Sequence, residues 1–219
     1  MSVEITWFGN AWFRLRADGK LVHFDPLSEK YQKTFGVEAV LDASEKADLV
    51  AISHSHPDHW DRDTLDSLRG PATVIVAPRK PAKSIEGAKE IEAGASIAVD
   101  GIDVKAVPAY NLHKFYHRKG HGVGYLVKIG GKTIYHAGDT DFIPEMTSLG
   151  KVDVALIPIG GKYTMDVQEA AQAVRAISPA MVVPMHNLDT DRSELARLLA
   201  DVPSIRTLVP ELGKPFPLY

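Results

Sequence analysis

Short apolar runs, separated by turn residues or by amphipathic stretches, make up most of the chain. Runs rich in β-branched and aromatic residues predict strands, and the dipeptides Asp18-Gly19 and Asp100-Gly101 are typical of tight hairpin turns. Two short stretches with helical spacing, residues 61–68 and 81–87, each follow a predicted strand. The strands predicted in this half are residues 3–8, 12–16, 20–24, 49–53, 73–77, 96–99 and 102–107.

The second half of the chain repeats this plan. Its clearest element is an amphipathic helix over residues 166–177, in which Val167, Ala170 and Val174 share one face. Asp166 is a suitable N-cap, and Glu169 three positions later completes a capping box. The other elements predicted here are strands at residues 122–129, 132–136, 152–158, 180–184 and 207–209 and a last helix at residues 193–200.

Each half therefore reads as strand hairpins followed by a strand–helix–strand unit. The chain has 219 residues, 45% of them hydrophobic, which suits one large core. We expect a single domain over residues 1–219, with two sheets packed face to face and helices on the outer faces. A doubly wound parallel sheet would account for the second half but not for the hairpins of the first.

Composition narrows the possible chemistry. The chain has no cysteine, which excludes disulfides, thiolate metal ligands and a cysteine nucleophile. Any metal must be held by histidine and carboxylate side chains. A net charge of −3 makes nucleic acid an improbable partner. The apolar runs are too short for a membrane span, and residues 1–8 resemble a strand more than a signal peptide, so we expect a cytoplasmic protein.

The densest cluster of potential ligands is His54-Ser55-His56-Pro57-Asp58-His59, between a predicted strand and a predicted helix. Three imidazoles and one carboxylate within six residues suit Zn²⁺, Mn²⁺ or Fe²⁺. Strand-to-helix loops are also the usual location of sites in α/β proteins. A solvated polar loop is the alternative, and it leaves the repetition of ligand types unexplained.

Further candidates lie at the ends of later strands. Asp139 follows Gly138, where the lack of a side chain would let the backbone approach a metal closely, and His186 follows the strand at residues 180–184. The alternatives are an ordinary turn carboxylate and a core histidine. His23, alone in a strand, is best explained as structural.

Taken together, these motifs resemble the metallo-β-lactamase superfamily. Residues 54–59 match the pattern His-x-His-x-Asp-His, and Gly138-Asp139-Thr140 and Pro184-Met185-His186 follow in the expected order. The resemblance covers nearly the whole chain and is closest to a group of small metal-dependent hydrolases that includes ascorbate-phosphate lactonases. It implies a four-layered αββα fold and two divalent metal ions, with Zn²⁺ as the first choice and Mn²⁺, Fe²⁺ or Ni²⁺ also compatible.

The resemblance also implies a set of ligands. His54, His56 and a third histidine would bind one ion, and Asp139 would bridge to the second. The third histidine is one of His113, His117 and His121, and His117 is favoured because Arg118-Lys119-Gly120 and then a strand follow it. The ligands implied for the second ion are Asp58, His59 and His186.

Other residues are expected to support these ligands or to touch the substrate. Asp25 could fix the tautomer of a ligand imidazole, and His136 is either a buried histidine bonded to its neighbours or a similar support. Asn10 stands where the group usually has a histidine, which puts a substrate-binding role there in doubt. The remaining substrate candidates are His113, Lys114 and Arg118, with Arg79 and Lys80 after another strand; if they face the metals, they favour an anionic substrate.

The leading interpretation is a hydrolase of a small ester, lactone or phosphodiester, in which a hydroxide held by two metals attacks and Asp58 and Asp139 act as catalytic carboxylates. One alternative is a nuclease of the same fold, which the acidic balance and the lack of an added domain disfavour. Another is a metal or ligand-binding protein without catalysis. The partner expected is a small-molecule substrate, and a homo-oligomer is compatible with the sequence.

Overall fold

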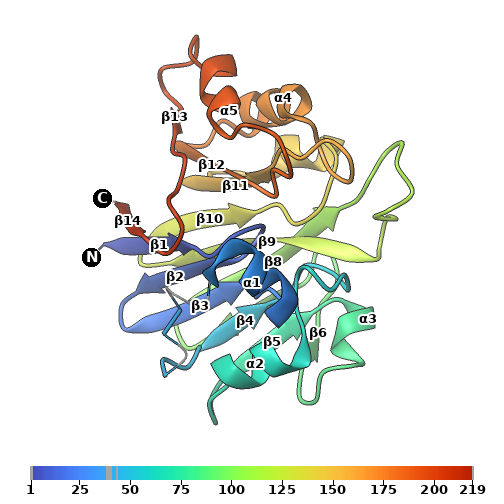
Figure 1. Ribbon diagram of the computed structural model, residues 1–219, viewed down its shortest axis with the longest axis vertical. Helices are drawn as coiled ribbons and strands as arrows, with labels where there is room; N and C mark the ends of the chain where they lie inside the picture. The colour runs from blue at the N-terminus through green and yellow to red at the C-terminus, as the bar shows by residue number, and fades with distance from the viewer. Residues whose placement is uncertain (1, 38–40, 43, 219) are drawn as a thin grey trace.

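The computed structural model describes residues 2–37, 41, 42 and 44–218. Within these residues, two mixed sheets pack face to face (Figure 1). The strands of the first sheet are β1 (Val3–Trp7), β2 (Phe13–Ala17), β3 (Lys20–Phe24), β4 (Leu49–Ala51), β5 (Val74–Ala77), β6 (Lys89–Glu90) and β14 (Pro215–Leu218). The strands of the second are β7 (Ser96–Val99), β8 (Ile102–Ala109), β9 (Gly122–Ile129), β10 (Lys132–His136), β11 (Val154–Pro158), β12 (Met181–Met185) and β13 (Arg206–Thr207).

The two sheets are built in the same way. The first has the order β14-β1-β2-β3-β4-β5-β6, and the second has the order β13-β12-β11-β10-β9-β8-β7. In each, antiparallel hairpins come first along the chain and parallel strands follow. Strand β14 returns to pair with β1, so the two ends of the chain lie side by side (Figure 1). This is the repeated plan that the sequence predicts.

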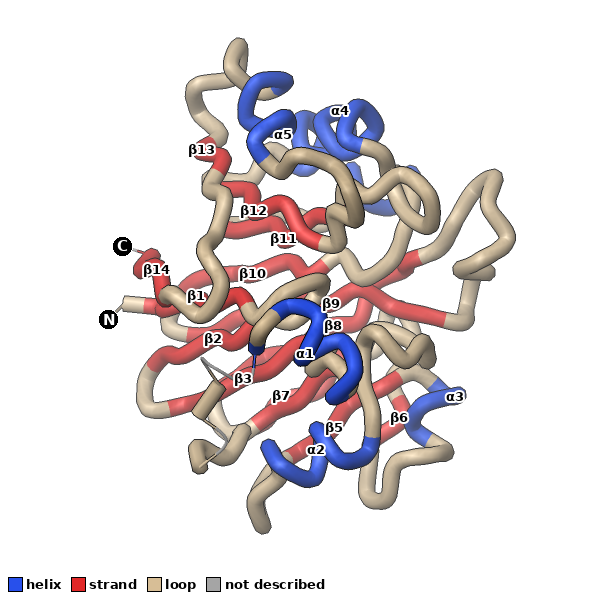
Figure 2. The backbone as a smooth tube through the Cα atoms, viewed as in Figure 1, coloured by secondary structure: helices blue, strands red, loops and turns tan. Residues whose placement is uncertain are grey.

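Helices cover the outer faces of both sheets (Figure 2). Helices α1 (Glu29–Phe35), α2 (Arg62–Leu68) and α3 (Arg79–Ala82) lie beside the first sheet, and α4 (Val167–Ile177) and α5 (Ser193–Leu198) lie beside the second. A 3₁₀ turn, η2 (Pro144–Ser148), packs against α4. The αββα architecture expected from the sequence is confirmed.

The main hydrophobic cluster fills the space between the sheets. It includes Phe24 from β3 and Tyr125 from β9, whose rings lie 6.4 Å apart. The Tyr125 hydroxyl donates a hydrogen bond to the Ile52 carbonyl at 2.7 Å, which ties the second sheet to the strand end before the histidine motif. Within the described residues, no helix combines the length and the apolar character needed to cross a membrane.

Some elements differ from the sequence-based expectation. The helix expected at residues 81–87 is the single turn α3, which begins earlier and ends at Ala82. Helix α1 was not expected because it has no buried residue and therefore no hydrophobic periodicity. Strand β14 contains Pro215 and Pro217, which are tolerated only because it lies at a sheet edge. Asp166 caps α4 as expected, but the Glu169 carboxylate accepts from the Phe142 amide instead of completing the box.

Candidate metal centre

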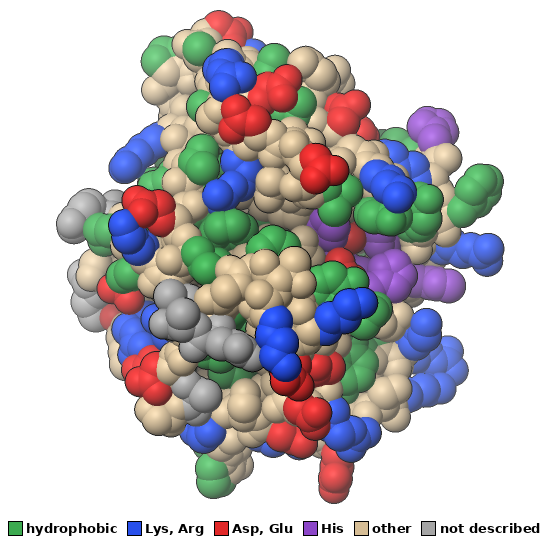
Figure 3. Space-filling view, viewed as in Figure 1, with side chains coloured by type: hydrophobic (Ala, Val, Ile, Leu, Met, Phe, Trp, Pro, Cys, Tyr) green, Lys and Arg blue, Asp and Glu red, His purple; other side chains and the backbone are tan. Residues whose placement is uncertain are grey.

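Four loops bring the candidate ligands together at one edge of the two sheets. The motif at residues 54–59 follows β4, Asp139 follows β10, His186 follows β12, and His117 lies in the long loop between β8 and β9. In the space-filling view, histidine side chains gather in a hollow beside that loop (Figure 3). The carboxyl ends of strands from both sheets thus supply the site.

Three histidines form what we call the cavity half of the site. His54 Nε2 lies 3.0 Å from His56 Nδ1, which lies 3.2 Å from His117 Nε2. Two ligands of a tetrahedral ion with bonds of about 2.1 Å are separated by roughly 3.4 Å. The three nitrogens therefore have a spacing close to that of ligands around one ion, and His117 is the histidine of the 113–121 loop that reaches the cluster.

Asp58, His59 and His186 form a second group, which we call the inner half. The Asp58 Oδ2 atom lies 3.6 Å from His59 Nε2 and 3.4 Å from His186 Nε2. These three donor atoms again lie together at ligand spacing. His59 and His186 are almost completely buried, whereas 23% of the Asp58 side chain is exposed.

Asp139 lies between the two halves. One of its oxygens is 3.3 Å from His117 Nε2 in the cavity half and 3.3 Å from His186 Nε2 in the inner half. Its other oxygen is 3.4 Å from His59 Nε2. It contacts ligands of both groups from a buried position, which is what a bridging carboxylate requires.

Hydrogen bonds fix the tautomers of the imidazoles on both sides of the site. Asp25 accepts from His59 Nδ1 at 2.8 Å, so Nε2 is the nitrogen of His59 that faces the cluster and can bind a metal. The Ser53 hydroxyl donates to Asp25 at 2.5 Å and therefore accepts from His54 Nδ1 at 2.9 Å. A single carboxylate thus orients His59 directly and His54 through a hydroxyl relay, one imidazole in each half.

The His117 imidazole is fixed in the same way by its own loop. Its Nδ1 lies 3.1 Å from the Asn111 side-chain oxygen and 3.2 Å from the Tyr163 carbonyl, both of which are acceptors. Nδ1 therefore carries the proton and Nε2 presents its lone pair to the cluster. Sequence analysis singled out neither Ser53 nor Asn111, because their role depends on contacts between segments that are distant along the chain.

The residues present fit metal ions. Among the described residues, the buried atoms His59 Nε2, His186 Nε2 and Asp139 Oδ1 have no hydrogen-bond partner. These atoms lie close to one another but are not aligned for hydrogen bonds. Leaving buried polar atoms without a partner lowers the stability of the folded protein. Divalent cations would satisfy them, and the all-nitrogen and oxygen donor set suits Zn²⁺, Mn²⁺, Fe²⁺ or Ni²⁺.

Electrostatics differ between the two halves. Burial and the neighbouring His59 lower the pKa of His54, and burial likewise lowers the pKa of His56 and of His117. Burial opposes charge on His186 too, but Asp139 and Asp58 outweigh it and raise the pKa of His186 to about 9. In the metal-free protein the cavity half is therefore neutral at pH 7, whereas the inner half pairs charged imidazole with carboxylate.

The backbone is strained around the inner half. Asn10, Asp25 and His186 all have positive φ values, of 45°, 44° and 43°. The Asn10 side-chain amide donates to the Asp58 carboxylate, and the Asn10 backbone carbonyl accepts from the His186 backbone amide at 3.2 Å. The loop at Asn10 therefore holds two of the proposed ligands in position. Gly138 has φ 63°, and a Cβ there would lie 2.9 Å from the Val123 carbonyl, so its role is close backbone packing.

A cavity of about 150 Å³ opens on the cavity half. Among the described residues, its lining includes His54, His56, His117 and Asp139 but none of the inner half. Of the residues expected to touch substrate, Lys80 lines this cavity, whereas the others lie elsewhere in this structure. Asn10 is buried against Asp58, His113 and Arg118 are exposed outside the lining, and the Lys114 amine is bound to Asp141 at 2.6 Å.

His136 supports the fold more directly than it supports a ligand. Its Nε2 lies 2.9 Å from the Ala11 carbonyl, its Nδ1 accepts from the Gly138 amide, and its ring stacks on Phe24. Its Nε2 is 4.0 Å from Asp25, which is too long for a hydrogen bond.

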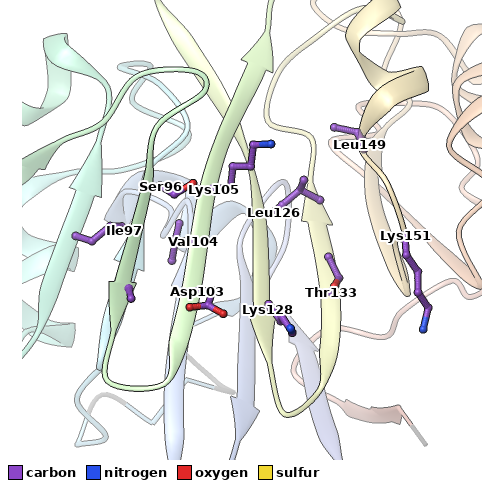
Figure 4. A pocket seen from close by; sticks show the side chains of 11 residues that line it. Ser96, Ile97, Asp103, Val104, Lys105, Leu126, Lys128, Thr133, Leu149 and Lys151 are labelled. Atoms are coloured by element: carbon purple, nitrogen blue, oxygen red, sulfur yellow. The ribbon is translucent and has the colours of Figure 1, made fainter.

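A larger groove of about 470 Å³ crosses the outer face of β7, β8, β9 and β10 (Figure 4). Its labelled side chains include Asp103, Lys105, Lys128 and Lys151 but no histidine and no second carboxylate. This surface offers no cluster of donors, so we place the chemistry at the histidines despite the smaller volume of their cavity.

Comparison with known proteins agrees with this geometry. Residues 4–186 match the model of the β-lactamase superfamily domain. The chain belongs to the β-lactamase superfamily. It is 35% identical over 225 residues to a UPF0173 metal-dependent hydrolase of Thermoplasma acidophilum, covering 98% of both chains, and 34% identical to one of Thermococcus kodakarensis, covering 95% of this chain and 97% of that one.

Solved structures give the same assignment. A metallo hydrolase from Ignicoccus hospitalis has 27% identity and a TM-score of 0.79, covering 100% of this chain and 99% of that one. A Parabacteroides distasonis protein has 31% identity and a TM-score of 0.86, covering 96% of this chain and 93% of that one. The expectation of a metal-dependent hydrolase with the metallo-β-lactamase fold is thus confirmed at the level of the family.

Proposed function

We propose that this chain is a two-metal hydrolase of a small ester, lactone or phosphodiester. His54, His56 and His117 would hold one divalent ion, and Asp58, His59 and His186 would hold the other. Asp139 would bridge them. The observation that carries the proposal is the convergence of seven donor side chains, with the imidazoles of His54, His59 and His117 held in the ligand tautomer and buried donor atoms left without partners.

Bound divalent ions would polarise the electrophilic oxygen and make a nearby water more acidic. The chain supplies the remaining requirements. Asp58 and Asp139 provide negative charge at the site, and Asp58 is exposed enough to accept a hydrogen bond from an incoming water. Hydrolysis then adds one water across the bond: the water oxygen stays on carbon or phosphorus, and the leaving oxygen takes up a proton. No serine or cysteine nucleophile is needed.

The proposal extends to the setting of the enzyme. Zn²⁺ is the first choice of metal, with Mn²⁺, Fe²⁺ and Ni²⁺ compatible with the same donors. A cavity of about 150 Å³ suits a small molecule better than a polymer. We further propose that residues 1–219 act as one cytoplasmic domain, alone or as a homo-oligomer.

A substrate panel tests the function. Protein stripped of metal and reloaded with Zn²⁺ or Mn²⁺ is assayed on a phosphodiester, a phosphomonoester, a lactone, a carboxylic ester and a thioester. We expect turnover on at least one class, abolished by EDTA and by Asp58→Ala. Asp63→Ala, which removes an exposed carboxylate from α2, should keep it. Full metal occupancy without turnover on any class would favour a binding protein and overturn the proposal.

A further inference from the structure

The cavity beside the metal centre is lined by two chemically different sets of side chains. One set is His54, His56, His117 and Asp139, where the proposed reaction takes place. The other set includes Lys80, Tyr116 and His121, none of which is a proposed metal ligand. At roughly 30 Å³ for each water molecule, the volume of about 150 Å³ suits a small ligand.

Lys80 is the only lysine or arginine in the described lining of the cavity. It comes from α3, the single turn that follows β5, and its amine makes no ion pair within the part of the chain that the structure describes. Lysines on the neighbouring loop differ, because Lys114 is bound to Asp141 and Lys119 to Glu145.

The same lining includes an aromatic side chain that is held in place. The ring of Tyr116 packs edge-on against Tyr163, with centroids 4.7 Å apart and planes at 87°. His121 lies on the same loop near the start of β9. A group entering the cavity therefore meets one ammonium and an aromatic side chain, and Asp139 is the only carboxylate of the described lining.

We propose that Lys80 binds an anionic group of the substrate that is separate from the bond being broken. This inference rests on the proposed hydrolase and narrows its substrate to a small ester or lactone that carries a carboxylate or phosphate. The reacting group lies at the histidines, and the second anionic group lies against Lys80. Lys80 is thus a specificity-determining residue, whereas Lys114, another cation that the sequence offers near the site, is already bound to Asp141.

The test compares two ligands that differ only in the second anion: glutarate and its monoamide, which has no ester bond to hydrolyse. Isothermal titration is done on Zn²⁺-loaded wild type, Lys80→Ala, Lys80→Arg and Lys83→Ala, the last removing an exposed lysine just after α3 that does not line the cavity. We expect wild type to bind glutarate roughly five- to tenfold more tightly than the monoamide, as for a partly exposed charged pair. Lys80→Ala should remove this preference, while Lys80→Arg and Lys83→Ala should keep it.

The same preference should appear in catalysis. For the mono-p-nitrophenyl ester of adipate and its neutral methyl ester, the ratio of kcat/KM should fall to about one in Lys80→Ala, through KM. Equal binding of glutarate and its monoamide by wild type, no detectable binding, or an unchanged preference in Lys80→Ala would overturn the inference. Hydrolysis of both esters at equal efficiency would overturn only this inference, whereas absent hydrolysis of every substrate class would count against the proposed function.

Discussion

The two halves of the site hold their metal-binding side chains in position by different means. The cavity half consists of three imidazoles whose pKa values are lowered, and it borders the cavity without backbone strain at its own residues. The inner half pairs two imidazoles with Asp58 and with the bridging Asp139, and it lies away from the cavity. It also depends on residues with left-handed backbone, a conformation that costs of order 1 kcal/mol or more at each position.

We infer from this difference that the two halves have different roles in the site. The cavity half is open to a substrate and ready to bind a cation at neutral pH, because its nitrogens carry no competing protons. The inner half is built as a fixed anchor, in which buried charge pairs, Asn10 and a strained turn hold Asp58 and His186. The two halves meet at Asp139, at Asp25 behind the ligands, and where the His54 and His59 rings lie 4.1 Å apart.

Removing the shared carboxylate should have the largest effect. Asp139→Asn keeps the size of the side chain but removes the charge that faces both halves. We expect weakened metal binding in both halves and a loss of kcat/KM by roughly three orders of magnitude or more. Metal analysis and kinetics check this. Asp103→Asn, on the groove of the other face, is the control; a variant that keeps one half fully loaded would show that Asp139 serves only one ion.

Substitutions in the Asp25–Ser53 relay behind the ligands should have an intermediate effect on metal binding, and they should distinguish the two halves. Asp25→Asn disturbs both His59 and His54, whereas Ser53→Ala interrupts only the path to His54. We expect Asp25→Asn to weaken metal binding in both halves by about 10- to 100-fold, and Ser53→Ala to do so in the cavity half alone.

Competitive titration with a chelator measures these affinities, and ¹⁵N chemical shifts of the metal-free protein report the His54 tautomer. Ser53→Thr retains a hydroxyl and should restore both. If Ser53→Ala left the His54 tautomer and the affinity of the cavity half unchanged, the relay would have no positioning role.

The smallest difference expected between the two halves is in the pH dependence of their metal affinity. In the metal-free protein the pKa of His186 is raised to about 9, and that of His59 is also well above its ordinary value. A metal must displace these protons, so the affinity of the inner half should rise with pH from 7 to 9, by up to about tenfold per pH unit for each proton. The cavity half, whose histidines are already neutral, should show almost no change. Titrations of Asp58→Ala and His56→Ala measure each half alone, and equal slopes would remove the distinction.

The sequence alone predicts most of the fold and the metal-ligand motif, but it does not predict all of the side chains that support the ligands. The strand hairpins, helix α4 and the ligand motif follow from patterns confined to short segments. Helix α1 and strand β14 do not, since one buries nothing and the other contains two prolines. The roles of Ser53 and Asn111 also stay hidden, because they depend on which side chains meet across the β4 and β8–β9 segments, whereas Lys80 is named from the sequence and only its place in the cavity needs the structure. The same holds for Lys114, whose partner Asp141 lies on another loop.

We propose that one chain holds two ions in two separable halves. The most direct test is the metal content per chain of Zn²⁺-saturated wild type, His56→Ala and His186→Ala, determined by native mass spectrometry and plasma elemental analysis. We expect two ions in wild type and one in each variant. A single ion in saturated wild type, or the loss of both ions from each variant, would contradict it.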